Sequence, residues 1–150
     1  MNQGWLEERA VRLGVSARDW QEAVRIAGQR LVDLGLADER YPEAMVRCVH
    51  EFGPYIVVAP GVAVAHARPE EGGLKDGIVL VRLDPSLPFG HADNDPVTFL
   101  FAFSARESGH HLEMLKDLAV LLADQEAMAA LNAATTPGEA VRAVQSVRGT

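Results

Sequence analysis

Two nearly continuous apolar runs in the middle of the sequence constrain the fold more than any other feature. The runs are Ile78-Val79-Leu80-Val81 and Val97-Thr98-Phe99-Leu100-Phe101, and both are rich in β-branched and aromatic residues. A strand with one face in water alternates apolar and polar residues, whereas a continuous apolar run is typical of a strand buried on both faces. The sequence therefore predicts a β-sheet covered by helices on each side.

Helical periodicity flanks this β-rich region on both sides. Helices are predicted over residues 5–13, 16–35, 41–52, 110–122, 125–133 and 137–147. In the second of these segments the apolar residues recur at steps of four and three, the period of one helical face. Ser16 and Asp19 mark a start for that helix, and Gly35 marks its end. Gly14 similarly ends the short first segment.

Strands are predicted over residues 55–59, 61–66, 77–83 and 97–105. The polar connection 84–96 is long enough to suggest a functional loop. Helices come first, strands second and helices last, without the repeated strand–helix alternation of a simple doubly wound domain. We therefore expect an α/β fold with a mixed β-sheet flanked by helices on both faces, built by residues 1–150 as a single domain.

Composition and charge exclude several classes of partner. The 150 residues carry a net charge of −7, and the scattered Lys and Arg residues form no basic stripe for nucleic acid. A basic protein surface would suit the chain better. No run of 18 apolar residues or signal-peptide pattern is present, so we expect no direct membrane insertion and a cytoplasmic location. The single cysteine, Cys48, fits a reducing compartment.

A histidine interrupts the small, apolar segment 60–69. Because side chains alternate along a strand, Val62, Val64 and His66 share one face, and His66 stands where the strand ends. Imidazole is largely neutral at pH 7 and nucleophilic, so this side chain could accept a phosphoryl group and hand it on. An ordinary strand-end residue is the alternative interpretation of His66.

A second histidine lies on the apolar stripe of a predicted helix. His111, Leu115, Leu118 and Leu122 fall within about 40° of one another on a helix. His111 is thus either a core histidine hydrogen-bonded to the backbone or a second imidazole brought beside His66. The amino terminus of the helix also offers unpaired N–H groups to an anion.

Metal and nucleotide chemistry find little support in the sequence. The residues that a metal site would have to use show no HExxH, CxxC or His-x-His spacing; they are His50, His66, His91, His110, His111, Asp93 and Asp95. Neither GxxxxGK[ST] nor GxGxxG occurs, and Cys48 is better placed for a core than for nucleophilic attack. We expect no metal and no cofactor, and a histidine-rich metal hydrolase is the least favoured alternative.

Three segments together resemble the EIIA components of the bacterial phosphoenolpyruvate:sugar phosphotransferase system (PTS). The resemblance is to the mannitol/fructose class, called EIIA type 2, and within it to the ascorbate-type branch. The segments are 53–69, with GPYIVVAPGVAVAHARP, 89–97, with FGHADNDPV, and 111–119, with HLEMLKDLA. The resemblance implies the mixed-sheet α/β fold of that class and covers nearly the whole chain.

The resemblance also implies a phosphohistidine relay and its partners. His66 would accept a phosphoryl group from HPr and pass it to a cysteine of EIIB, for uptake of a sugar or sugar acid through the membrane component EIIC. His111 would hydrogen-bond the phosphoryl group or orient His66. The alternative role within the family is regulatory, with signalling through the phosphorylation state. A homodimer is compatible with the sequence.

This chain departs from the mannitol-type pattern near the active histidine. Relatives of that type usually have Pro before the histidine, where this chain has Ala65, and an arginine in the preceding helix that contributes to the phosphate site. Arg47 lies near the corresponding place, and Arg68 is a second candidate for a phosphate contact. A partly apolar docking patch is expected around His66, and three residues are predicted to contribute to it: Val62, Val64 and Phe89.

Overall fold

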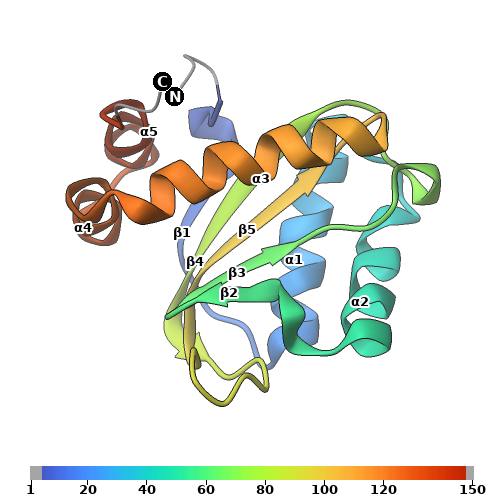
Figure 1. Cartoon of the computed structure of the whole chain (residues 1–150), viewed down its shortest axis with the longest axis horizontal. Coiled ribbons are helices and arrows are strands. Elements are labelled where there is room, and N and C mark those ends of the chain that lie inside the picture. Colours follow the sequence, from blue (N-terminus) through green and yellow to red (C-terminus); the bar gives the residue numbers. More distant parts are fainter. Residues whose placement is uncertain (1–4, 148–150) are drawn as a thin grey trace.

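The computed structural model describes residues 5–147, which build a five-stranded mixed sheet with helices on both faces (Figure 1). The strands are β1 (Val11–Val15), β2 (Val57–Ala59), β3 (Val62–Ala65), β4 (Gly77–Leu87) and β5 (Val97–Ser104). Their order in the sheet is β1-β4-β5-β3-β2. The pairs β1–β4 and β3–β5 are parallel, whereas β4–β5 and β2–β3 are antiparallel. The predicted fold class is therefore confirmed.

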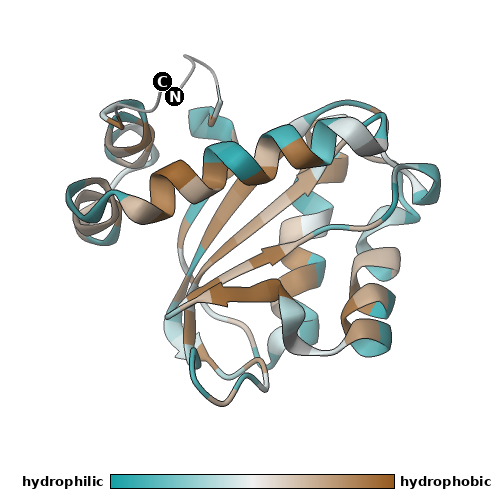
Figure 2. Cartoon of the chain, in the orientation of Figure 1, coloured by the Kyte–Doolittle hydropathy of each residue, from teal (hydrophilic) through white to brown (hydrophobic). Residues whose placement is uncertain are grey.

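Both apolar runs are buried central strands. Val79, Leu80 and Val81 are 0% exposed, and every residue of β5 except Thr98 is buried. The strands are also largely apolar in Figure 2. Because side chains alternate across a sheet, burial of consecutive residues requires cover on both faces, as the sequence predicts.

The cover comes from five helices. They are α1 (Trp20–Asp33), α2 (Tyr41–Phe52), α3 (Ser108–Ala123), α4 (Gln125–Ala133) and α5 (Pro137–Gln145). Helices α1 and α2 lie on one face of the sheet, and α3 crosses the other (Figure 1). Helix α1 begins later than residue 16 because the Asp19 carboxylate accepts the Glu22 N–H at 2.9 Å and caps the helix there. No helix within residues 5–147 is both long and apolar enough to cross a membrane.

The helix predicted over residues 5–13 is wrong. A 3-10 turn, η1 (Glu8–Ala10), leads directly into edge strand β1, in which Val11 pairs with Leu80 of β4. The strand alternates between buried and more exposed residues, the signature of an edge with partial cover. Pairing with the buried β4 strand outweighs the local propensity of such a short segment.

Helix α3 faces the sheet with a different stripe from the predicted one. Leu118 and Leu121 are buried, whereas Leu115 is 38% exposed. From Gly109 to Asp117 no residue is fully buried. In this stretch Met114 is partly buried and packs against the core, so the core holds the first two turns of α3 less firmly than the rest of the helix.

Candidate active site

The register between β3 and β5 places His66 next to Phe103. Val64 pairs with Phe101 and Ala65 with Ala102, so the residue that follows β3 falls beside Phe103. The two rings stack with centroids 4.7 Å apart and planes 9° from parallel. Residues 62, 64 and 66 share one face of the sheet, as the alternation predicts. Strand pairing therefore fixes the backbone under His66, and Phe103 fixes its ring plane.

The second histidine, His111, lies on α3 and contacts both rings of this stack. The centroid of the His111 ring lies 5.1 Å from that of His66, and the two planes make an angle of 67°. His111 also lies edge-on to Phe103, with centroids 5.1 Å apart. The structure thus brings together the two histidines that the sequence singles out, and it adds an aromatic ring that the sequence does not.

Neither imidazole is held as an ordinary core histidine. The Nδ1 atom of His66 and the Nε2 atom of His111 are buried and have no hydrogen-bond partner among the described residues. Buried polar atoms usually have a partner, and a missing one costs about 1–3 kcal/mol. Such an atom is tolerated where function requires it, and the hydrogen-bonded core histidine considered for His111 is not what the structure shows.

Burial keeps both rings neutral at pH 7. It lowers the pKa of His66 to about 4, with a further contribution from the nearby His111. The pKa of His111 is also lowered by burial, while the negative charges of Asp76 and Glu70 act in the opposite direction. A neutral imidazole keeps a lone pair on one ring nitrogen, so His66 is a competent nucleophile at neutral pH.

A cavity of about 360 Å³ opens onto the two histidines. Its walls come from the end of α2, the turn after it and the segment after β3, and they comprise Cys48, Phe52, Gly53, Tyr55, Ile56, His66, Ala67, Arg68, Pro69 and His111. Arg68 is exposed at this cavity. Arg47 does not line it, and its guanidinium lies 3.4 Å from the Glu71 carboxylate. Cys48 is half-buried on the cavity wall, and burial raises the pKa of its thiol.

Exposed aromatic side chains line this cavity. Phe52 is 51% exposed and Tyr55 is 78% exposed, while Leu112, which follows His111 on α3, is 58% exposed. Phe52 and Tyr55 also line a neighbouring cavity of about 380 Å³, together with Val57 and His91. An apolar surface therefore lies beside the histidines.

The residues predicted for this surface are the wrong ones. Val62, Val64 and Phe89 are at most 4% exposed. Strand β3 is an inner strand with both faces covered, so its side chains pack in the core.

Tyr41 is a site residue that sequence analysis misses. Its hydroxyl lies 3.1 Å from the Ala67 carbonyl and 2.9 Å from the Phe103 carbonyl, and it accepts the Ala67 N–H at 3.0 Å. Burial raises its pKa to about 12, so the hydroxyl keeps its proton. The Tyr41 hydroxyl thus links Ala67, which follows His66, to Phe103, on which the His66 ring stacks. Only its position at the start of a helix was visible in the sequence.

The other three histidines have different surroundings. His50 packs edge-on against Trp20, with ring centroids 5.1 Å apart. His91 accepts two backbone N–H groups of its own loop at Nδ1. His110 pairs with Asp76. Within residues 5–147 no group of three or more His, Cys, Asp or Glu side chains is arranged to hold a metal ion.

The fold and the site together define a small α/β protein with a neutral, accessible imidazole suited to accepting and releasing a group. Residues 5–147 match the family model described as "Phosphoenolpyruvate-dependent sugar phosphotransferase system, EIIA 2", and the chain belongs to this family. It is therefore a PTS EIIA component with a role in phosphoryl transfer.

Known relatives agree in sequence and in fold. The chain is 41% identical over 134 residues to the ascorbate-specific PTS system EIIA component of Escherichia coli (strain K12), covering 89% of this chain and 87% of the relative. The solution structure of the mannitol-specific cryptic enzyme IIA CmtB from Escherichia coli matches with a TM-score of 0.82 at 32% identity, covering 97% of both chains. Enzyme IIA of the Escherichia coli mannitol system, solved in complex with phosphorylated IIB, shares the fold at 24% identity, with a TM-score of 0.82 and coverage of 93% and 98%.

Proposed function

We propose that His66 is the phosphoryl acceptor in a relay that runs from the phosphohistidine of HPr, through this protein, to a cysteine of EIIB. The sugar taken up would be a sugar acid of the ascorbate type. The observation that carries this proposal is the neutral His66 ring, stacked on Phe103 and beside His111 at an open cavity. The ascorbate-specific relative supports the choice of substrate class.

The burial of one ring nitrogen supports a choice of the atom of His66 that reacts. Because Nδ1 is buried, Nε2 is the nitrogen that an incoming phosphoryl group can reach. Its lone pair would form the new P–N bond as the P–N bond of the donor breaks, and the EIIB thiolate would later take the phosphoryl group from it. No cofactor or metal is needed for this exchange, because phosphoryl transfer depends mainly on positioning and charge stabilisation.

Charge stabilisation would come from His111 and Arg68. We assign to His111 the role of hydrogen-bonding the phosphoryl group or orienting His66, because its ring lies edge-on to His66. Arg68 is assigned as a phosphate contact, because it lines the same cavity. Arg47 is a weaker candidate, since it is paired with Glu71 away from the cavity lining. Donors placed before the reaction stabilise the transferred charge without reorganisation.

The exposed surface around the cavity is where we place docking of HPr and EIIB. Exposed aromatic residues at the centre of a small interface typically carry much of its binding energy. The net charge of −7 favours partners with basic surfaces and attracts them over a distance. EIIC would receive the sugar in the membrane without contacting this site.

Phosphorylation in a reconstituted mixture tests the proposal. With phosphoenolpyruvate, EI and HPr present, we expect the protein to gain acid-labile phosphate and to pass it to EIIB. His66→Ala should gain none, whereas His50→Ala should be labelled normally because His50 packs against Trp20 and lines neither cavity. Normal labelling of folded His66→Ala would refute the assignment.

A further inference from the structure

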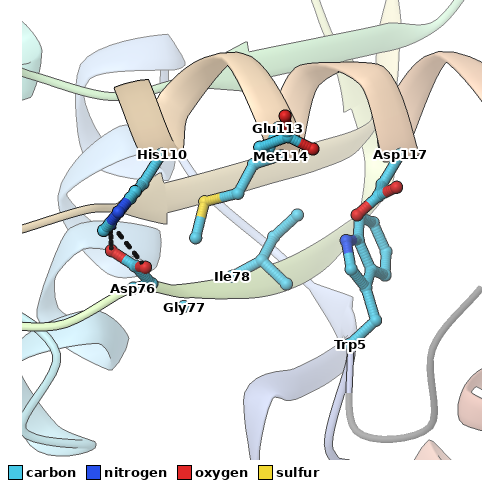
Figure 3. Close-up of a pocket in the computed structure, with 8 residues that line it drawn as sticks. All are labelled: Trp5, Asp76, Gly77, Ile78, His110, Glu113, Met114 and Asp117. Carbon is cyan, nitrogen blue, oxygen red and sulfur yellow. Dashed lines mark hydrogen bonds and ion pairs between the residues drawn. The ribbon is translucent and has the colours of Figure 1, made fainter. Parts of the chain in front are cut away.

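His110, the neighbour of His111, points towards Asp76, just before the start of β4 (Figure 3). Its Nδ1 atom lies 2.8 Å from Oδ2 of Asp76 and 2.9 Å from Oδ1. Asp76 Oδ1 also accepts the Arg106 N–H at 3.0 Å. The Asp76 carboxylate, just before β4, thus contacts both Arg106, which precedes α3, and His110, in the first turn of α3.

The beginning of α3 needs such an anchor. Its N-cap residue, Glu107, makes no side-chain capping hydrogen bond, and the first turn contains no acidic residue. Between Gly109 and Ala123 the first buried residue of the helix is Leu118. Unpaired N–H groups at a helix start favour a nearby negative charge, and Asp76 supplies it from another element. The pair therefore adds a hold on the part of α3 where, among the described apolar residues, Met114 packs against the core, and that part carries His111.

The surroundings of the pair define which charges act on it. The Glu107 carboxylate lies 3.9 Å from Nε2 of His110. Besides Asp76, three titratable groups interact electrostatically with the His111 ring: Glu70, His110 and His66. Hydrogen bonds from Arg106 and His110 outweigh burial and hold the pKa of Asp76 below its usual range, so the carboxylate is ionised at neutral pH.

We propose that Asp76 and His110 are positioning residues for His111, and that they set its ring at the angle required beside His66. The inference rests on the proposed function of His66 and His111. Neither residue touches the phosphoryl group, so both act through His111. Reacting groups need placement to within about 1 Å, and a misplacement of that size can cost up to about 100-fold in rate.

Variants of the pair separate positioning from folding. Asp76→Asn and His110→Ala should lower kcat for phosphoryl transfer about tenfold and leave KM for phosphorylated HPr unchanged. His110→Asn should retain most of the rate, because its amide puts an N–H donor near the place of Nδ1. The matched control is Asp117→Asn. Asp117 lines a further cavity, of about 310 Å³, together with Asp76 and His110, and its side chain has no hydrogen bond or ion pair within residues 5–147 (Figure 3).

A titration of the His111 ring by NMR tests, without any phosphoryl transfer, whether Asp76 lies close enough to act on that ring. Asp76→Asn should lower the pKa of His111, since it removes a charge that raises this pKa, and Asp117→Asn should leave it in place. Wild-type rates with Asp76→Asn, equal losses with both aspartate variants, or no rescue by folded His110→Asn would overturn the inference. A wild-type protein that accepts no phosphate would refute the proposed function, while the His111 titration would still show whether Asp76 acts on His111.

Discussion

The imidazole of His66 lies parallel to the phenyl ring of Phe103, with centroids 4.7 Å apart and planes 9° from parallel. Phe103 is itself fully buried on a central strand. The histidine is thus held against a rigid surface on one side, while its cavity side stays open to a partner. Preorganisation of this kind would place the proposed nucleophile before the partner arrives.

Phe103→Leu should therefore slow the reaction more than it weakens the fold. Loss of the flat support frees the His66 ring, and we expect about a tenfold lower kcat for phosphorylation. The free energy of unfolding should fall by about 1–2 kcal/mol. Phe101→Leu is the matched control, because Phe101 is equally buried on the same strand face and has no ring contact with either histidine. Equal loss of rate in both variants would contradict a supporting role for Phe103.

The depressed pKa of His66 makes the stability of the protein depend on pH. The unfolded chain takes up a proton near the ordinary value of 6.5, and the folded chain only near 4. Stability should thus be greatest above pH 6.5 and fall as the pH drops towards 4, by up to about 3 kcal/mol from this group. Urea unfolding at several pH values measures the slope. His66→Gln should give a shallower slope, and an identical slope would show that His66 titrates normally.

Tyr41→Phe should disturb the backbone on both sides of the active-site stack. It leaves the buried Ala67 N–H without its acceptor, and we expect a loss of about 1–3 kcal/mol in unfolding free energy. The rate of phosphorylation should also fall, because Ala67 directly follows His66. Tyr55→Phe provides the control, since that tyrosine is 78% exposed and should change stability by nearly nothing. Similar effects of the two substitutions on unfolding would rule out the buried hydroxyl as a tie.

The sheet and the two histidines could be predicted because their signals are local. Continuous apolar runs mark central strands wherever they occur, and a histidine in a run of small residues stands out without any knowledge of its neighbours. Strand β1 was wrongly predicted as a helix. An edge strand of five residues shows too few apolar–polar alternations to outweigh a helical pattern. The predicted sheet-facing stripe of α3 was wrong at Leu115 for a related reason. Exposed leucines made the apolar face of the helix look wider than the face that packs on the sheet.

The support around the histidines could not be predicted, because it depends on contacts between distant segments. Tyr41 reaches residues 26 and 62 positions away, and Asp76 reaches His110 across 34 positions. No spacing rule connects such residues before the strands are paired. The exposed apolar surface that we propose for docking was missed for the same reason, since only the fold shows that β3 is an inner strand and that Phe52 and Tyr55 stay outside.

Phe52→Ser and Tyr55→Ser test whether this exposed surface receives the partners. Both residues lie between the cavity at His66 and the neighbouring cavity, so a partner that delivers a phosphoryl group must cover them. Each substitution should raise KM for phosphorylated HPr or for EIIB about tenfold, because truncation of a central aromatic residue commonly costs more than 1 kcal/mol. The value of kcat and the unfolding free energy should stay near wild type, since both side chains are largely exposed. Leu74→Ser is the control: Leu74 is 49% exposed but lines neither cavity. If KM responds no more to the aromatic substitutions than to this one, the partners dock elsewhere.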